Sequence, residues 1–142
     1  MKKTNPYQVT EWYRSVIRTQ IKPGDLCIDA TMGNGHDTLF LSQLAGPSGC
    51  VLAFDIQQAA LDSTKALLQE HEHLAPVQLL LDSHAHMSSY ADPGTVSCIV
   101  FNLGYLPSGD RHPQRVNNCS TGTRTGTFKD RRMHQSLYLQ WR

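Results

Sequence analysis

A glycine turn between an apolar run and a helix-like segment constrains this chain more than any other feature. The apolar residues 26–28 end in Asp29, and Gly33 and Gly35 follow. A helix-like segment over residues 37–45 comes next. Such a turn lets a ligand approach backbone N–H groups at the positive end of the helix. We therefore expect a ligand site at this turn.

A second acidic residue extends the pattern. Asp55 closes the next apolar run, which covers residues 51–54. A carboxylate about 20 residues beyond such a glycine turn is placed to hold the two ribose hydroxyls of a nucleotide-like cofactor. The turn and the acid together favour a cofactor-binding α/β domain.

Composition and length point to one small soluble domain. The chain has 142 residues, 39% hydrophobic and 18% charged, which is long enough to bury a core. No apolar run reaches the length of a membrane span, and residues 1–6 lack the apolar stretch of a secretory signal. We therefore expect a cytoplasmic protein without a membrane partner.

The cysteines and histidines predict neither disulfides nor a metal. No CxxC pair occurs, and three of the four cysteines fall in expected strands, so we expect buried, reduced thiols. The pairs His71-x-His73 and His84-x-His86 lack a third ligand at a suitable spacing. The four cysteines are Cys27, Cys50, Cys98 and Cys119.

Strand-like and helix-like segments alternate along the chain. The expected strands cover residues 25–30, 50–55, 77–81 and 96–101, and the expected helices cover 9–21, 36–45, 57–70 and 84–90. This alternation with continuous apolar strands indicates a parallel sheet covered on both faces. Right-handed crossovers place the loops after each strand along one edge, where α/β folds bind ligands. Polar residues end the four strands at that edge: Asp29, Asp55, Asp82 and Asn102.

These residues resemble a class I S-adenosylmethionine-dependent methyltransferase, whose first motif is an acid followed by three alternate glycines. Here Thr31, Gly33 and Gly35 follow Asp29, so threonine replaces the first glycine. The segments DATMGNGHDT, AFDIQ, DSH and FNLGYLPSGD resemble a bacterial family described as rRNA methylases. That family includes a tRNA methyltransferase that methylates 5-aminomethyl-(2-thio)uridine at the wobble position. The resemblance covers roughly residues 7–110 and implies a Rossmann-like sheet.

The resemblance also implies where S-adenosylmethionine would lie. The loop over residues 31–35 would pass under the methionine part, with Asn34 and Asp37 at its amino or carboxylate end. Asp55 would accept both ribose hydroxyls, with Gln57 beside the ribose or the adenine. Three further residues would reach the adenine edge. The cofactor-binding residues implied are Thr31, Gly33, Asn34, Gly35, Asp37, Asp55, Gln57, Asp82, Ser83 and His84.

Two further positions are implied to be catalytic. Asn102 and Tyr105 resemble the first and last residues of the Asn-Pro-Pro-Tyr motif of amine methyltransferases, with Leu103-Gly104 in place of the prolines. The Asn102 amide oxygen would accept amine hydrogens, and Tyr105 would stack on the base or on the cationic centre. The alternative for Tyr105 is a structural loop anchor.

The last 32 residues differ from the rest. Residues 1–110 hold six Lys and Arg against eleven Asp and Glu, whereas residues 111–142 hold seven against one. The apolar periodicity ends after residue 110. We therefore expect a partial methyltransferase domain at residues 1–110, whose sheet is incomplete at four strands, and an irregular, aberrant basic tail at residues 111–142. The fourth strand would keep an open edge.

The genetic code offers an explanation for this tail. When the codons from Asn117 onward are read one nucleotide later, permitted codon choices give TTAALEQGLELLKTGGCISL. This string reads as an amphipathic helix, a helix stop and the start of a strand. We interpret the tail as out of frame, and a genuine basic, disordered arm that binds RNA is the alternative.

The sequence as a whole predicts an enzyme that N-methylates an aminomethyl-uridine in tRNA, with rRNA as the other candidate RNA. Because the far edge of the sheet is expected to be missing, this chain could alternatively be inactive. The sequence does not decide whether it forms a homodimer. A nucleotide-dependent oxidoreductase is a second class, although Thr38 replaces the third glycine of GxGxxG. A non-catalytic RNA-binding fragment is a third. RNA contacts before the tail would rest on Lys2, Lys3, Arg14 and Arg18.

Overall fold

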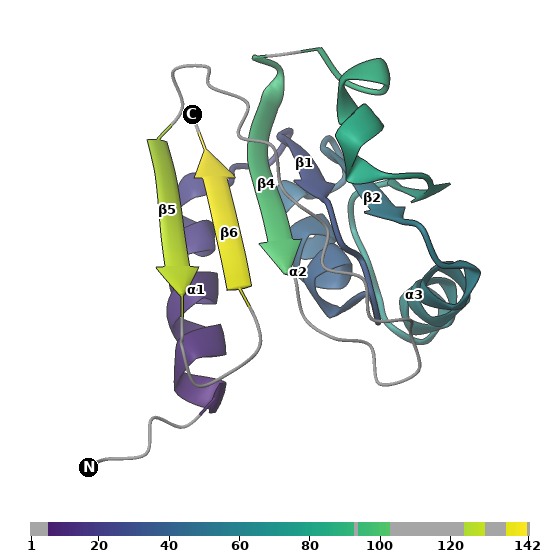
Figure 1. The fold of residues 1–142 in the computed structure, drawn as a ribbon, viewed down its shortest axis with the longest axis horizontal. Helices are drawn as coiled ribbons and strands as arrows, with labels where there is room; N and C mark the ends of the chain where they lie inside the picture. Colours follow the sequence, from purple (N-terminus) through teal and green to yellow (C-terminus); the bar gives the residue numbers. More distant parts are fainter. Residues whose placement is uncertain (1–5, 93, 103–123, 130–135, 142) are drawn as a thin grey trace.

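The computed structural model describes residues 6–92, 94–102, 124–129 and 136–141. Strands and helices alternate through the first part of the chain, as the sequence predicts (Figure 1). The helices are α1 (Pro6–Gln20), α2 (His36–Ala45), α3 (Gln58–Glu70) and the 3-10 helix η1 (His84–Ser89). The strands are β1 (Leu26–Asp29), β2 (Cys50–Asp55), β3 (Val77–Leu81), β4 (Val96–Asn102), β5 (Arg124–Lys129) and β6 (Ser136–Trp141).

One mixed sheet organises these elements, with the strand order β3-β2-β1-β4-β6-β5. The first four strands of this order are parallel, with Ile28 of β1 paired to Leu52 of β2 on one side and to Ile99 of β4 on the other. Since β1 lies between β2 and β4, the chain crosses over at this point. The carboxyl ends of β1, β2, β3 and β4 therefore meet at one edge of the sheet, which confirms the predicted parallel α/β architecture.

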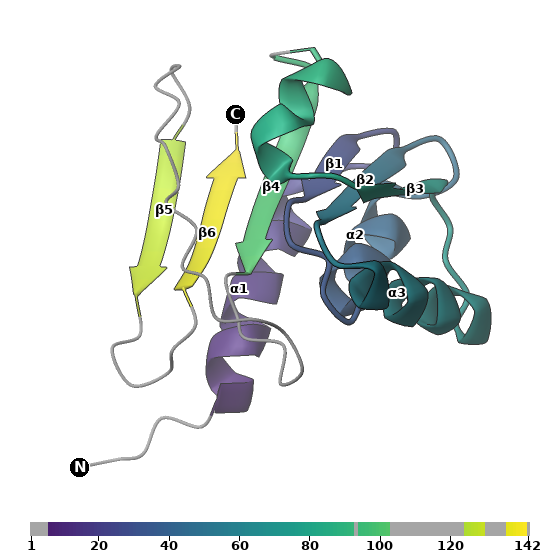
Figure 2. The ribbon, with the colours of Figure 1, turned by 45° about the vertical axis from the view of Figure 1, so that its right-hand side comes forward.

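The described helices do not divide equally between the two faces of the sheet. Along β2, Val51 and Ala53 point to one face and Leu52 and Phe54 to the other. Val51 lies in the cluster that α1 and α2 cover, and Ala53 clusters with residues of α3. Leu52 and Phe54 cluster on the opposite face, where Met87 of η1 packs. Figure 2 shows the three α-helices together on their side of the sheet.

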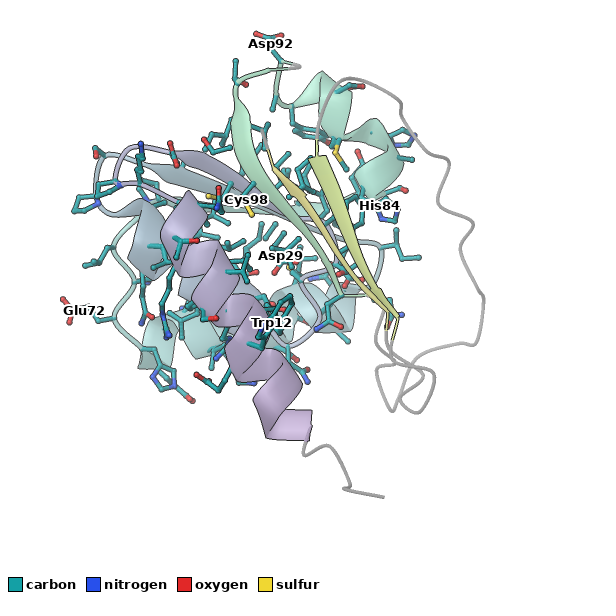
Figure 3. All side chains as sticks on the ribbon, turned by 90° about the vertical axis from the view of Figure 1, so that its left-hand side faces the viewer. Trp12, Asp29, Glu72, His84, Asp92 and Cys98 are labelled. Carbon is teal, nitrogen blue, oxygen red and sulfur yellow. The ribbon has the colours of Figure 1, made fainter. Side chains whose placement is uncertain are left out.

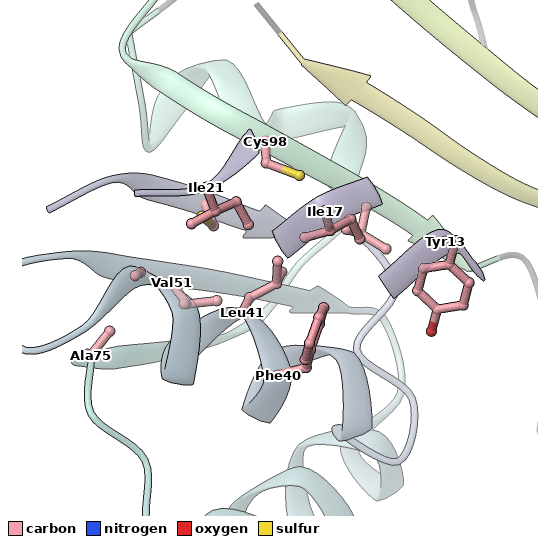
Figure 4. Packing of buried hydrophobic residues seen from close by; sticks show 11 residues of the cluster. Tyr13, Ile17, Ile21, Phe40, Leu41, Val51, Ala75 and Cys98 are labelled. Atoms are coloured by element: carbon pink, nitrogen blue, oxygen red, sulfur yellow. The ribbon is translucent and has the colours of Figure 1, made fainter. Parts of the chain in front are cut away.

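The largest core cluster fixes α1 against α2 and the sheet. Tyr13 and Ile17 of α1 and Ile21 directly after it repeat every four residues, so they form one apolar stripe. This stripe meets Phe40 and Leu41 of α2 above the central strands (Figure 4). Burial of each such side chain stabilises the fold by about 1.5–3 kcal/mol. Three of the cysteines lie in strands β1, β2 and β4, as expected, and are free thiols: Cys27, Cys50 and Cys98.

The C-terminal residues require a correction. We expected an irregular tail, a sheet of four strands and an open edge at β4, but β6 pairs antiparallel with β4 and β5 pairs with β6. Residues 124–129 and 136–141 are rich in threonine, aromatic and leucine residues, which suit extended, paired backbone. The edge of β4 presents unpaired N–H and C=O groups, and this hairpin satisfies them. The sheet therefore continues past its parallel part.

Membrane insertion finds no support in the described helices. None of them combines the length and the apolar character that are needed to cross a bilayer.

Candidate cofactor and acceptor site

The turn between β1 and α2 is built on two glycines with positive φ. Gly33 has φ 51° and Gly35 has φ 84°, a region that side chains rarely adopt. Gly35 also lies against α3, because an added Cβ would come within 2.8 Å of the Thr64 side chain. The Thr64 hydroxyl in turn donates to the Gly33 carbonyl oxygen at 3.2 Å. The turn is therefore tight, and α3 supports it from behind.

Asp55 faces this turn from the end of β2. The Gly33 N–H donates to one carboxylate oxygen of Asp55 at 3.2 Å, and the Gln57 N–H donates to the other at 3.0 Å. Asp55 is partly exposed. The glycine turn and the strand-end acid thus lie side by side, 22 residues apart in sequence.

Asp29 lies beneath the turn rather than in it. Its carboxyl group is completely buried, accepts from the Thr38 hydroxyl at 2.7 Å and accepts from the Thr31 N–H at 3.2 Å. Burial, reinforced by the nearby Asp37 carboxylate, raises the pKa of Asp29 to about 7. Figure 3 shows Asp29 near the centre of the view, whereas Glu72 and Asp92 lie at its periphery.

Asp37, in the first turn of α2, connects three segments of the chain. One of its oxygens accepts from the Tyr13 hydroxyl at 2.6 Å and lies 3.6 Å from the Arg14 guanidinium, both of α1. The other accepts from the Asn102 side-chain amide at 3.4 Å. The Asn102 N–H donates to the Thr31 hydroxyl at 2.7 Å, so the end of β4 is tied to the glycine turn as well.

Asp82, directly after β3, is held by contacts with residues that follow it closely in sequence. Its carboxylate contacts His86 Nδ1 at 2.8 Å and accepts from the Tyr90 hydroxyl at 2.8 Å. These contacts, that of His86 first, lower the pKa of Asp82. The Tyr90 ring also packs edge-on against Phe54 at 5.3 Å, which secures the end of η1 to the sheet.

His84 begins η1 and turns towards the sheet. Its ring contacts Phe101 edge-on, with the centroids 5.4 Å apart. Partial burial lowers the pKa of His84, which keeps the imidazole neutral at pH 7. Ser83 caps η1, because its hydroxyl accepts from the Ala85 N–H.

The predicted site residues in the described part of the chain all lie at or just beyond the carboxyl ends of the parallel strands. Hydrogen bonds join Gly33 to Asp55, Asp55 to Gln57, and Asn102 to both Thr31 and Asp37. Gly35 is buried in the turn, and Asn34 is exposed at its tip. Asp82 and Ser83 instead make their hydrogen bonds to residues 83–90. Tyr105 lies outside the described residues.

Three contributors escaped the sequence reasoning. The Tyr13 ring is buried in the core, and its hydroxyl also donates to Asp37. Arg14 was expected to face RNA, yet it lies beside Asp37 and over the Phe40 ring at 5.0 Å. His86 was considered only as a metal ligand or a base. The only signal in the sequence was the hydroxyl group of Tyr13 within the apolar stripe of α1. That signal does not show that Asp37 is its partner.

A family model matches the central part of the chain. The family model described as "Putative rRNA methylase" matches residues 51–123, more than half of the 142 residues. The chain belongs to this family. The matched region begins in β2 and includes Asp55, the residues after β3 and Asn102.

Relatives of this rRNA methylase family member have been named or solved in other organisms. The chain is 36% identical over 113 residues to the chloroplastic tRNA (mnm(5)s(2)U34)-methyltransferase of Arabidopsis thaliana. It covers 41% of that protein, and 73% of the chain is matched. A solved structure of an rRNA methylase from Clostridium thermocellum is 40% identical, with a TM-score of 0.66 over 78% of this chain and 57% of that one.

A third comparison supports the fold alone. A methyltransferase from Streptococcus mutans, solved in complex with SAH, is 23% identical with a TM-score of 0.72 and covers 99% of both chains. The predicted class I methyltransferase fold is thereby confirmed. The chain itself spans less than half of the plant relative and little more than half of the Clostridium chain.

Metal binding finds no candidate among the described side chains. Within that part of the family member, no group of three His, Cys, Asp or Glu residues is placed to hold an ion.

Proposed function

We propose that this chain carries the cofactor-binding part of an S-adenosylmethionine-dependent RNA methyltransferase. The observation that carries the proposal is the hydrogen bond from the Gly33 N–H to Asp55, because it brings the glycine turn and the ribose-binding acid to one edge. The family and the plant relative support RNA as the substrate class. Bound S-adenosylmethionine would supply a methyl group that its sulfonium already activates.

The residues at this edge fit such a cofactor. A carboxylate has about four lone-pair sites, and the two backbone N–H groups on Asp55 leave acceptor capacity for two ribose hydroxyls. Hydrogen bonds of this charge-assisted kind contribute about 1.5–3 kcal/mol each. The partly buried, neutral His84 would lie on the adenine side together with Asp82 and Ser83. Asn34, exposed at the tip of the turn, would reach the methionine end.

Thr38 argues against a dinucleotide oxidoreductase. This residue stands where a GxGxxG turn has its third glycine, which permits close packing of helix on strand. Here the side chain is buried and donates to Asp29. The position is therefore used to anchor a carboxyl group rather than to bring the two elements closer.

The finer proposal is methylation of an aminomethyl-uridine at the wobble position of tRNA by a cytoplasmic enzyme. An alkylamine with a pKa near 10 must lose a proton before it attacks, which costs about 4 kcal/mol at pH 7. Asn102, and Tyr105 beyond it, would orient that amine for in-line displacement. A homodimer is part of this proposal, to be tested by light scattering. Methyl transfer to tRNA bearing the aminomethyl group, against an rRNA fragment, tests the substrate.

The cofactor assignment is tested by calorimetry on the full chain. We expect S-adenosylhomocysteine to bind and NAD to show no heat of binding. Asp55→Ala should weaken S-adenosylhomocysteine binding by tenfold or more, because it removes acceptors that are worth over 1.4 kcal/mol. Asp62→Ala is the matched control, since Asp62 is an exposed carboxylate on α3 that binds only Gln58 in the described contacts.

Three outcomes would contradict the assignment. Equal affinity in Asp55→Ala and Asp62→Ala would remove Asp55 from the site. Tighter binding of NAD than of S-adenosylhomocysteine would favour the oxidoreductase. RNA binding that is lost with residues 111–142 and indifferent to Asp55→Ala, without any cofactor binding, would favour the non-catalytic RNA-binding fragment.

We also propose that residues 1–110 form the methyltransferase domain and that residues 111–142 are read out of frame. The change of composition at that boundary and the amphipathic string in the shifted frame support this. The nucleotide sequence across codons 108–120 tests it. An insertion or deletion is expected there, and an intact frame in independent isolates would favour a genuine basic arm.

A further inference from the structure

The Asp37 carboxylate determines how the Asn102 side chain is oriented. The two side chains meet at 3.4 Å between an Asp37 oxygen and the Asn102 amide. An ionised carboxylate accepts hydrogen bonds and donates none, whereas an amide has one donating and one accepting end. Only the NH2 end of Asn102 can therefore face Asp37. The carbonyl end must point elsewhere, and it remains without a partner from Asp37.

Tyr13 holds the Asp37 carboxylate in the position from which it orients Asn102. Its hydroxyl donates to the other oxygen of Asp37 at 2.6 Å, and the tyrosine is only 6% exposed. Burial and the Asp37 charge raise the pKa of Tyr13 well above its usual range, so the hydroxyl remains a donor at neutral pH. Figure 4 shows the Tyr13 ring at the end of the core cluster, with its oxygen directed away from Ile17 and Cys98.

The other charged groups around Asp37 do not replace this bond. The Arg14 guanidinium lies 3.6 Å from the same oxygen, which is an ion-pair distance longer than a hydrogen bond, and it also stacks over Phe40. Asp29 makes no hydrogen bond to Asp37 among the described contacts, and its own oxygens accept from Thr31 and Thr38. Tyr13 thus supplies the short directional contact.

We propose that Tyr13 is a positioning residue, which acts through Asp37 to hold the Asn102 amide with its carbonyl oxygen free to accept hydrogens from the substrate amine. Asn102 is partly exposed, as this role requires. The inference rests on the proposed amine methyltransferase for its substrate, but its structural part concerns only the described side chains. Through Tyr13, α1 would help to position the substrate amine, a role that is separate from cofactor binding.

The orientation is tested by NMR on the full chain labelled with ¹⁵N-asparagine. Asn102→Ala identifies the Asn102 side-chain signal by its loss. We expect Tyr13→Phe to move that signal and to raise the exchange rate of its amide protons by fivefold or more. Tyr90→Phe is the matched control, because it also removes a tyrosine hydroxyl from an aspartate, Asp82, but leaves the Asp37 contacts intact. An unchanged signal in a folded Tyr13→Phe overturns the proposal.

A second variant covers a failure of Tyr13→Phe to fold. Asp37→Asn keeps the shape of the side chain but can both donate and accept, so it no longer selects one end of Asn102. We expect the same change of the Asn102 signal, and an unchanged signal in this variant overturns the proposal as well. Neither readout needs cofactor or RNA. If the chain does not bind the cofactor but the Asn102 signal still changes in these variants, the proposed function is wrong and the proposed orientation of Asn102 is retained.

Kinetics separate positioning from general support of the fold. In the methyl-transfer assay we expect Tyr13→Phe to lower kcat about tenfold. In the Asn102→Ala background the same substitution should have no further effect on kcat, because its target is gone. An equal reduction of kcat in both backgrounds would mean that Tyr13 does not act through Asn102.

Discussion

Asp29 is a carboxyl group that the fold removes from water altogether. Two donors, the Thr38 hydroxyl and the Thr31 N–H, compensate part of the cost of burying it. Desolvation nevertheless dominates and raises its pKa to about 7. The fold therefore favours the protonated form of this carboxyl group, which lies beneath the glycine turn.

The raised pKa of Asp29 should make the free energy of unfolding depend on pH. The folded pKa of about 7 lies above the unfolded value of 3.8, so the folded state holds the proton more tightly. The contribution of Asp29 to the free energy of unfolding is therefore present at low pH and is lost as the pH rises through 7. The full difference is at most about 4 kcal/mol.

Asp29→Asn should remove that dependence, because the amide does not titrate and still accepts from Thr31. We expect the variant to match the wild type near pH 4 and to become the more stable protein by pH 8. Urea unfolding at both pH values measures this. A stability difference between variant and wild type that stays constant with pH would show that Asp29 is already ionised in the folded protein at pH 4.

Individual site residues differed in how far the sequence could place them. Gly33 and Asp55 were predictable because each follows a strand, and parallel strands end at one edge. Tyr13 was not, because its partner is 24 residues away and depends on how α1 crosses the sheet. Asp82 is predicted to lie near the adenine, and the sequence did not show that His86 and Tyr90, four and eight positions later, contact its carboxylate.

At the scale of the elements, the glycine turn before α2 lies directly against α3 at Gly35. A Cβ on this residue would lie 2.8 Å from two side-chain atoms of Thr64 and 2.9 Å from its Cα. The last of these is backbone, so a change of rotamer cannot relieve it. The loop and α3 therefore have a fixed spacing.

Gly35→Ala should be the costlier of two glycine substitutions in the turn. Gly33 has φ 51° and meets nothing closer than 3.9 Å, so Gly33→Ala adds only the left-handed strain of about 1–2 kcal/mol. Gly35→Ala adds the displacement of α3 to a similar strain. We expect its melting temperature to fall well below that of Gly33→Ala. Equal losses in a thermal melt would mean that α3 moves freely away from the turn.

Most element boundaries could be read from periodicity. The apolar stripe of α1 and the continuous apolar strands each carry a strong local signal, and the structure confirms those elements to within a few residues. The strands β5 and β6 could not be read in this way. Their sequences hold a weak preference, and they become strands only because β4 offers an edge.

At the scale of the whole molecule, the basic last part of the chain pairs with the acidic first part through β6 and β4. Strand β6 lies between β4 and β5, with Leu139 opposite Val100 on one side and Gly126 on the other. The net charges of the two parts are of opposite sign, which favours this association. In the structure β6 is therefore an internal strand of the sheet, and β5 forms its edge.

Leu139→Pro tests whether the protein depends on this pairing. Proline removes an N–H and fixes φ, so a strand that is paired on both sides loses a ladder hydrogen bond. Leu139→Ala is the control for loss of the side chain alone. We expect the proline variant to unfold at a clearly lower urea concentration than the alanine variant. Identical midpoints would mean that residues 136–141 form a tail that does not contribute to the sheet.

The overall topology followed from the order of elements, but the distribution of helices did not. Alternating strands and helices predicted a sheet covered on both faces. Among the described residues, α1, α2 and α3 all pack on the face of Val51 and Ala53, and only η1 covers the other. Apolar strands indicate that both faces are shielded, whereas only the crossovers in three dimensions decide which helix shields which.

The three-way meeting at Asp37 has a consequence for biosynthesis. Its partners on α1 leave the ribosome before it, but Asn102 follows 65 residues later. A nascent polypeptide that has emerged only as far as β3 already exposes the glycine turn and Asp55, whereas Asn102 is still inside the ribosome. In the proposed methyltransferase, cofactor binding can therefore precede the ability to transfer a methyl group, which requires β4 to insert beside β1.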